Sequence, residues 1–352
     1  MMEIDVEGVE QRVFTGVLPA WDRVEEAVQD AHRRSSSAAD GSVADYIPAL
    51  ANADPDLFGV CVVETDGAVH GAGDTDAAFS IQSVSKVLTY ALASDTVGHD
   101  VIAERIGVNS TGQSFDSVMA IELNGGHTMN PMVNAGAIAT TALLPGADAG
   151  ERWEILHDAF SRFAGRSLEL DEDVYRSEAE HNQRNMAIAR LLESYGRLDV
   201  EPLEIVDVYT KQCSLRVTAR DLAVMGATLA DGGVNPVTDD HVVSPEACTA
   251  TLAVMATSGL YERSGEWLFE IGIPGKSGVS GGILAVVPGK AGIGVYSPPL
   301  DDAGNSVRGQ RSLAYLSRVL GLNLFASAPR AGGGSREGDP DAAVDSRTTD
   351  DS

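Results

Sequence analysis

The pattern of apolar and polar positions predicts β-hairpins in two places, near opposite ends of the chain. The first strand pattern, residues 58–65, is followed by Asp66 and Gly67, a pair that favours a tight turn, and the pattern resumes at 68–70. The second place has β-rich runs at 283–287 and 292–296, on either side of Pro288 and Gly289. We therefore expect one hairpin early in the chain and one late.

Elsewhere the apolar positions recur with helical spacing. The pattern predicts an amphipathic helix over about 18–34, an apolar helix over 82–97, a largely helical region over 100–262 and a closing helix over 307–320. Strands at both ends with helices between them indicate an α/β (α+β) fold. We expect one antiparallel sheet formed by both ends of the chain, an inserted helical lobe, and a cleft between the two.

The same pattern predicts three parts along the chain. Residues 1–40 form an N-terminal extension with a helix, and 41–325 form the main folded domain. Within that domain the sheet portion covers about 41–80 and 265–325, and the helical lobe covers about 100–262. The Gly-rich, acidic residues 326–352 are expected to be disordered.

Composition narrows the possible functions. A formal charge of −27 and an isoelectric point near 4.4 argue against nucleic-acid binding, which needs clustered positive charge. The sequence has no run of 18 apolar residues, so no membrane span is expected. The 52 acidic residues against four lysines suggest a halophilic protein that carboxylates keep soluble in concentrated salt. That hypothesis predicts loss of the fold when salt is removed.

The three cysteines and the N-terminus favour a cytoplasmic location. Cys61, Cys213 and Cys248 are odd in number and lack the spacing of metal ligands, so we interpret them as buried and reduced. The first residues are acidic and lack the pattern of a secretory signal. No motif calls for a metal or another cofactor.

Two of the four lysines lie in motifs that together indicate nucleophilic catalysis. Ser83 and Lys86 form Ser-x-x-Lys at the start of the apolar helix, and Lys276 opens Lys-Ser-Gly ahead of a glycine-rich run. This order is the layout of serine acyl-transfer enzymes built like penicillin-binding proteins and class A β-lactamases. A lysine one helical turn away can accept the serine proton if its pKa is lowered. A second lysine nearby would lower that pKa, because like charges disfavour the charged form.

Simpler interpretations exist for the same residues. A serine three residues before a lysine is common on solvated helix faces, although this helix is apolar. Ser85 and Ser277 are rival nucleophiles. Ser85 is adjacent to Lys86 in sequence and should point away from its side chain. His127, His157 and His181 show no catalytic or metal spacing.

Further motifs accompany these two across residues 45–320: 45–48 (DYIP), 79–86 (FSIQSVSK), 130–137 (NPMVNAGA), 177–178 with Asn185, Tyr209 ahead of 212–214 (QCS), 259–261 (GLY) and 276–282 (KSGVSGG). In this order they resemble the motifs of the serine-dependent glutaminases, a cytosolic branch of the β-lactamase-like superfamily. The resemblance implies that residues 41–325 form a catalytic domain that hydrolyses L-glutamine to L-glutamate and ammonia. It also implies self-association as a homodimer or homotetramer.

The resemblance assigns roles to individual residues. Ser83 would be the nucleophile and Lys86 its base, with the N–H groups of Ser83 and Val279 forming the oxyanion hole. Glycines around Val279 would let a strand backbone approach the substrate. Tyr209 would relay a proton to the leaving ammonia, with Lys86 or Lys276 nearby. The residues implied to contact the substrate are Tyr46, Ser83, Asn134, Glu178, Asn185, Tyr209, Tyr261 and Val279.

Taken alone, several of these residues also fit purely structural roles. Asn134 could be a helix N-cap, Glu178 a solvated carboxylate in a charged segment, and Asn185 a partner for a buried backbone group. Tyr209 and Tyr261 could be core or rim aromatics. The alternative functions are another serine amidohydrolase, such as a β-lactamase or peptidoglycan peptidase, and a catalytically silent relative that binds glutamine. Selectivity for glutamine over asparagine stays open.

Overall fold

Both predicted hairpins are present and join in one antiparallel sheet. The computed structural model describes residues 18–45 and 47–327. The sheet has the strand order β2-β1-β8-β7-β6, with β1 at Gly59–Glu64, β2 at Val69–Gly73, β6 at Gly275–Ser277, β7 at Gly282–Val287 and β8 at Ala291–Tyr296. The register places Gly59 opposite Tyr296, so the early hairpin pairs with the late one. The prediction that both ends of the chain form the sheet is confirmed.

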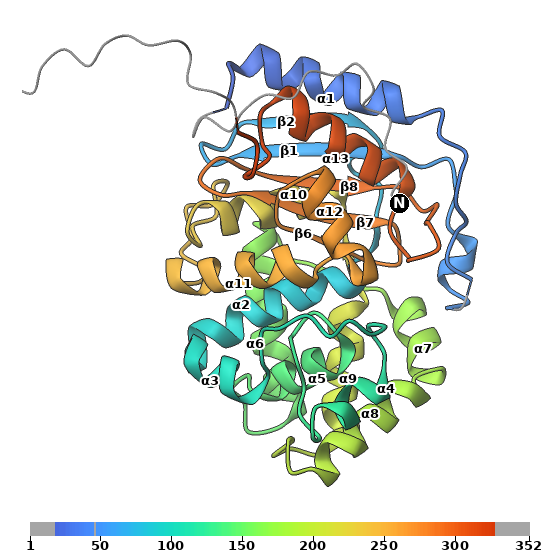
Figure 1. Ribbon diagram of the computed structural model, residues 1–352, viewed down its shortest axis with the longest axis vertical. Coiled ribbons are helices and arrows are strands. Elements are labelled where there is room, and N and C mark those ends of the chain that lie inside the picture. Colours follow the sequence, from blue (N-terminus) through green and yellow to red (C-terminus); the bar gives the residue numbers. More distant parts are fainter. Residues whose placement is uncertain (1–17, 46, 328–352) are drawn as a thin grey trace, which may run out of the picture.

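Helices cover both faces of this sheet. α1 (Trp21–Ser35) and α13 (Val307–Val319) lie on one face, at the top of Figure 1. α10 (Ala219–Ala230) packs against β8, β1 and β7 on the other face. A Cβ atom on Gly294 would lie 1.9 Å from the carbonyl oxygen of Ala219, so glycine is needed for this close packing. Because both faces are covered, β7 and β8 are apolar along their whole length.

The helical lobe occupies the lower half of Figure 1. Its helices are α2 (Ser85–Val97), α3 (His99–Arg105), α4 (Val118–Leu123), α5 (Asn134–Ala142), α6 (Ala149–Ala164), α7 (Glu172–Glu180), α8 (Gln183–Ser194), α9 (Pro202–Cys213) and α11 (Pro245–Ser258). α10 lies within the range predicted for the lobe but packs on the sheet. Its packing could not be inferred from helical spacing alone.

Short elements connect the lobe to the sheet. A second sheet has the order β3-β5-β4, with β3 at Phe79–Ser80, β4 at Glu169–Leu170 and β5 at Leu215–Val217. Single turns are η1 (Leu50–Asn52), η2 (Gln82–Val84) and η3 (Tyr261–Arg263), and η3 leads into α12 (Ser264–Glu270). β3 runs directly into η2 and then α2, so the small sheet fixes the start of the predicted nucleophile helix.

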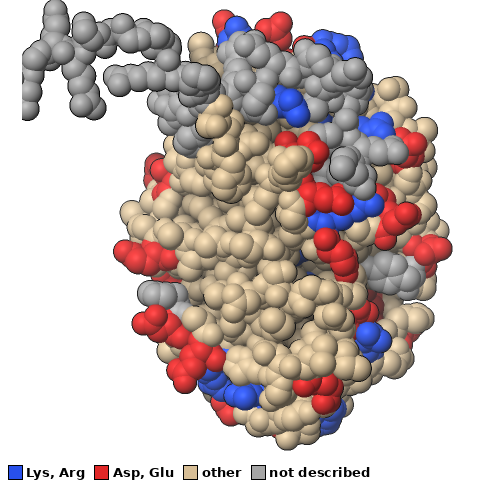
Figure 2. Space-filling model, in the orientation of Figure 1, with Lys and Arg blue, Asp and Glu red and all other residues tan. Residues whose placement is uncertain are grey.

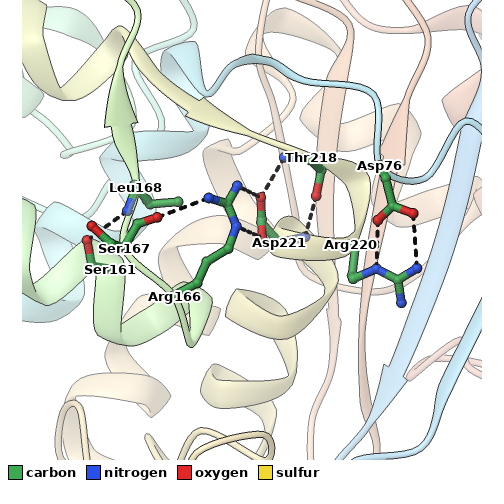
Figure 3. Close-up of polar contacts among 8 residues, drawn as sticks. All are labelled: Asp76, Ser161, Arg166, Ser167, Leu168, Thr218, Arg220 and Asp221. Atoms are coloured by element: carbon green, nitrogen blue, oxygen red, sulfur yellow. Dashed lines mark hydrogen bonds and ion pairs between the residues drawn. The ribbon is translucent and has the colours of Figure 1, made fainter.

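Charged side chains anchor the first turn of α10, as Figure 3 shows. The Thr218 hydroxyl accepts a hydrogen bond from the backbone N–H of Asp221, and the Asp221 carboxylate accepts one from the backbone N–H of Thr218. This reciprocal capping box satisfies donors that a helix start leaves free. Arg166 donates from two nitrogens to the same carboxylate, and Arg220 does so to Asp76. Through Arg166, these contacts join the first turn of α10 to the segment between α6 and β4.

Residues 1–17 of the predicted N-terminal extension lie outside the described residues. The predicted disordered tail, 326–352, also lies outside them except for residues 326 and 327. Within 18–45 and 47–327, no helix is both long and apolar enough to cross a membrane.

Candidate active site

A cavity of about 260 Å³ lies where the helical lobe meets the β6–β7 turn. Its lining residues come from η2 and from α5, α7, α8 and α9, together with the loop before α4: Ile47, Gln82, Ser83, Phe115, Asp116, Asn134, Glu178, His181, Asn182, Arg184, Asn185, Tyr209, Cys213 and Val279. Six of the predicted substrate contacts are in this set. Tyr46 lies outside the described residues, next to the lining residue Ile47.

Ser83 and Lys86 are in direct contact at one end of the cavity. The chain turns through η2 into α2 here, which places the two side chains one helical turn apart. Lys86 Nζ donates to Ser83 Oγ at 2.5 Å. Ser85 points elsewhere, because its hydroxyl contacts Cys213 Sγ at 3.6 Å and Gln212. Ser83 is thus the serine of this motif that faces both the lysine and the cavity.

Burial is the main cause of the low pKa of Lys86. Burial lowers the pKa of this amine to about 8, against the opposing effects of Cys213 and Glu178. Burial, and then the charge of Lys86, holds the pKa of Lys276 well below its usual range. The expected effect of one lysine on the other is therefore present, but it acts on Lys276. For Lys86 the removal from water is the larger cause.

Lys276 and Tyr261 meet on the sheet side of the nucleophile. Lys276 Nζ donates to the Ser277 carbonyl oxygen at 2.7 Å and lies 4.3 Å from the centre of the Tyr261 ring. The Tyr261 hydroxyl donates to the same carbonyl at 3.1 Å. Burial raises the pKa of Tyr261, so its hydroxyl keeps its proton at neutral pH. This cluster provides hydrogen-bond donors beside the nucleophile.

Tyr209 links the lysine to a pair of asparagines. Its ring centre lies 5.5 Å from Lys86 Nζ, and its hydroxyl donates to Asn134 Oδ1 at 3.3 Å. Asn134 Nδ2 in turn donates to Asn185 Oδ1 at 3.0 Å. Asn134 is the first residue of α5, whose N-cap is Val133, so the interpretation of Asn134 as a helix cap is wrong. Tyr209 packs in the core, as a core aromatic would, and it also lines the cavity.

Glu178 faces the cavity and is only partly exposed. Burial raises the pKa of its carboxyl to about 7, while a hydrogen bond from Gln82 and the charge of Lys86 oppose that rise. The interpretation of Glu178 as a solvated carboxylate is therefore wrong. The cavity holds Glu178 beside several amides and hydroxyls, and its second carboxylate, Asp116, is paired with Arg184. Glu178 with these amides and hydroxyls is a set that can recognise an ammonium group.

The glycine-rich pattern suggested that Val279 lies in a strand. In the structure it lies in the turn between β6 and β7. The Gly278 N–H donates to the Gly282 carbonyl, which closes the turn. Gly281 has φ +103°, and a Cβ atom there would lie 2.3 Å from the Ser297 carbonyl oxygen. Glycine is therefore required to bring the backbone of this turn against the cavity.

Some cavity residues were not singled out by the sequence. Gln82 and Cys213 lie inside the recognised motifs 79–86 and 212–214, so their position in those motifs could have indicated that they line the site. Phe115, Asp116 and Arg184 belong to a loop and to an exposed part of α8, where no pattern marks them. Within the described part of the chain, no group of three or more His, Cys, Asp or Glu side chains could hold a metal ion.

Comparison with known proteins places this chain in a defined family. A family model described as Glutaminase matches residues 41–325. Glutaminase 2 of Yersinia pestis is 53% identical over 322 residues, which are 92% of this chain and 95% of that protein. A glutaminase of Colwellia psychrerythraea strain 34H is 47% identical and covers 86% of this chain and 97% of its own length.

Solved structures agree with the sequence comparison. The structure of the probable glutaminase ybaS has a TM-score of 0.86 at 46% identity, covering 88% of this chain and 100% of that chain. Mglu in its L-glutamate binding form, in the presence of 4.3 M NaCl, has a TM-score of 0.81 at 40% identity, covering 87% of this chain and 68% of that one. The predicted β-lactamase-like fold is confirmed. The chain belongs to the glutaminase family.

Proposed function

We propose that this glutaminase hydrolyses L-glutamine to L-glutamate and ammonia through a covalent intermediate on Ser83. The observation that carries the proposal is the 2.5 Å contact between Lys86 Nζ and Ser83 Oγ inside a cavity that also holds Glu178. The relatives named glutaminase support the reaction, and the glutamate form of Mglu supports binding of the product in a fold of this kind.

In the first half-reaction Ser83 Oγ attacks the side-chain amide carbon of glutamine. The serine proton passes to neutral Lys86, whose pKa near 8 makes an unprotonated amine available at mildly alkaline pH. Backbone N–H groups of Ser83 and Val279 stabilise the negative oxygen of the tetrahedral intermediate. The C–N bond then breaks, ammonia leaves with a proton, and a γ-glutamyl ester remains.

In the second half-reaction water hydrolyses the ester. Lys86 accepts a proton from the water, the C–O bond to Ser83 breaks, and the serine regains its proton. Tyr209 lies beside Lys86 and keeps its hydroxyl proton, so it is placed to pass a proton to the leaving ammonia. Lys276 donates a hydrogen bond to the Ser277 carbonyl oxygen. Because it is buried near Lys86, the two amines disfavour being positively charged at the same time.

Recognition of glutamine follows from the charges in the cavity. The Glu178 carboxylate pairs with the α-ammonium group, and the amides of Asn134 and Asn185 together with the hydroxyls of Tyr209 and Tyr261 bind the carboxylate and side-chain amide. Tyr46 is proposed as a further contact on the strength of the family resemblance and its position beside Ile47.

The mechanism is tested by Ser83→Ala. We expect ammonia release to fall below detection while glutamine binding changes by less than about tenfold, because the nucleophile acts in the covalent step. The checks are coupled assays of ammonia and glutamate, calorimetric binding, and mass spectrometry of a trapped glutamyl ester. Substantial turnover by the variant would refute the covalent mechanism.

Two alternative functions are separated by these assays together with a test of nitrocefin hydrolysis. A silent glutamine-binding protein would bind glutamine without releasing ammonia. A β-lactamase or peptidase would hydrolyse nitrocefin in preference to glutamine. The Glu178 and Asn134 pair suits a free amino acid and favours the glutaminase over a β-lactamase or peptidase. The contact of Lys86 with Ser83 favours it over a silent binding protein.

The proposal extends to the setting in which the enzyme works. We place it in the cytoplasm of a salt-adapted cell, supported by three buried free cysteines and a charge of −27. Figure 2 shows acidic side chains on several separate parts of one face. Solved structures of Mglu and of a Bacillus glutaminase in 4.3 M NaCl support salt tolerance in similar proteins. An unchanged circular dichroism spectrum between molar and millimolar salt would contradict the halophilic part.

Two further parts of the proposal concern organisation. We propose a homodimer or homotetramer, to be measured by light scattering at high salt. The limits 1–40 and 41–325 are proposed as the N-terminal extension and the catalytic domain, and residues 326–352 as a separate C-terminal segment. The family match over 41–325 supports the middle part.

A further inference from the structure

Gln82 directly precedes the proposed nucleophile and has an unusual backbone conformation. Its φ is +50°, in the left-handed region that residues other than glycine rarely adopt. Consecutive residues of a regular helix or strand point in different directions. The left-handed conformation interrupts that geometry at the entry to α2, and both Gln82 and Ser83 line the cavity as a result.

The side-chain amide nitrogen of Gln82 has two hydrogen-bond acceptors. It is 4% exposed, and its amide nitrogen donates to Glu178 Oε1 at 2.5 Å and to Ser80 Oγ at 3.2 Å. The carboxylate can only accept while ionised, so the amide must present its nitrogen, and not its oxygen, to Glu178. We infer that Gln82 is a positioning residue, whose side-chain amide orients the Glu178 carboxylate towards the α-ammonium group of glutamine.

This inference rests on the proposed function, since it concerns how the proposed substrate is held. It also gives the backbone strain at Gln82 a role, because that conformation brings the amide to Glu178 while leaving Ser83 beside Lys86. One residue thus connects the site of bond cleavage with the site of ammonium recognition. Strained backbone that the surroundings hold in place is common where function requires it.

The electrostatic effect of the contact has a definite sign. Burial raises the pKa of Glu178 to about 7, and the bond from Gln82 opposes that rise by favouring the ionised form. The other titratable groups facing or lining the same space are Lys86 from α2, Tyr209 and Cys213 from α9, His181 after α7, Arg184 from α8 and Asp116 from the loop before α4. Loss of the Gln82 amide removes one stabilising partner and leaves these groups unchanged.

The test is the pH profile of kcat/KM for Gln82→Leu. Without the amide, Glu178 should ionise only at higher pH, so the acid limb of the profile should move upwards. We expect kcat/KM at pH 6 to fall about tenfold and to recover to within about threefold at pH 9, where Glu178 is ionised in both enzymes. The loss should lie in KM more than in kcat, because ammonium binding is affected and the Ser83–Lys86 contact is not.

Two further variants separate this effect from damage to the fold. Gln82→Gly relieves the positive φ and removes the same amide, so it should show the same shift of the acid limb with less loss of stability. Gln212→Leu is the matched control: Gln212 is another buried glutamine, bonded to Thr89 and Thr141 and not to Glu178. It should lower stability and leave the position of the acid limb unchanged.

A glutamine analogue without the α-amino group completes the design. With that substrate, Gln82→Leu and the wild type should have parallel profiles. An acid limb that stays in place in both Gln82 variants, or that moves equally in Gln212→Leu, would overturn the inference. Either result leaves glutamine hydrolysis by the wild type intact. Failure of the proposed function would instead appear as no release of glutamate and ammonia by the wild type.

Discussion

The lysines of the active cavity and the arginines at the start of α10 have the same formal charge in opposite surroundings. Lys86 and Lys276 are buried, and they donate to a hydroxyl and a carbonyl. Arg166 and Arg220 are nearly half exposed, and each holds an aspartate through two nitrogens. The difference teaches that burial without an ion-paired carboxylate prepares a lysine to lose its proton, whereas an ion pair with a carboxylate keeps a cation charged.

The pKa shifts follow the same division. Burial lowers the pKa of Lys86 to about 8 and also lowers that of Lys276. Hydrogen bonds from Arg166 to Asp221 and from Arg220 to Asp76 raise the pKa of each guanidinium. Among these four side chains, the buried lysines lie in and beside the proposed active site, and the partly exposed arginines pair with carboxylates.

The most severe test of this division is Lys86→Arg. Arginine keeps the positive charge but does not release its proton at working pH, so kcat should fall roughly a thousandfold, as in Lys86→Ala. Initial rates of ammonia release measure the effect. If the arginine variant is nearly as active as the wild type, Lys86 serves only as a fixed charge.

Substitutions among the residues that anchor the first turn of α10 should lower the stability of the fold and leave the catalytic rate unchanged. Asp221→Ala removes the capping box and leaves Arg166 without its partner, so the free energy of unfolding should fall by about 3 kcal/mol. Urea denaturation at high salt measures it. Asp231→Ala, at the exposed far end of the same helix, is the control and should change little. A lowered kcat in folded Asp221→Ala would show that the anchor also shapes the active site.

Replacing Lys86 by methionine should raise stability while abolishing activity. The folded-state pKa of Lys86 is lowered, so its burial costs stability in full below about pH 8, where the folded and the unfolded chain both hold the proton. We expect a gain of about 1–2 kcal/mol at pH 7, which should shrink as the pH rises from 8 towards 10.5. Urea midpoints across this range provide the measurement. A gain in stability that stays constant with pH would contradict this prediction, because it would show that the gain does not come from removing the lysine charge.

The smallest change is expected at the exposed pair of Arg220 and Asp76. Arg220→Gln should cost less than about 1 kcal/mol, because ion pairs in contact with water are screened. The cost should be smaller in molar salt than at low ionic strength. A cost as large as that of Asp221→Ala would remove the distinction between the buried and exposed parts of the anchor.

Much of the fold and part of the site could be predicted from local sequence patterns. The hairpins follow from turn residues between apolar runs, and the contact of Ser83 with Lys86 follows from their spacing on one helix. The packing of α10 on the sheet could not be predicted from helical periodicity, because it depends on Gly294, whose role appears only when the partner helix is known. Pairing of the two hairpins is likewise a long-range contact.

The remaining site residues depended on the family resemblance or were missed. Nothing in the local sequence around Glu178 distinguishes a cavity carboxylate from its exposed neighbours, because burial comes from packing against distant segments. Arg184 and Asp116 form an ion pair at the cavity, but neither lies in a recognisable motif. Tyr46 stays a prediction.

The pairing of β1 with β8 has a consequence for synthesis on the ribosome. The early hairpin is complete soon after it leaves the exit tunnel, but the edge of β1 finds its partner only when residues 291–296 have been made. At about 5–20 residues per second, that interval is roughly 10–50 s. During it an apolar strand edge is open to pairing with other chains. We expect nascent chains truncated before β8 to associate with chaperones or to aggregate, and chains extended past α13 to escape both.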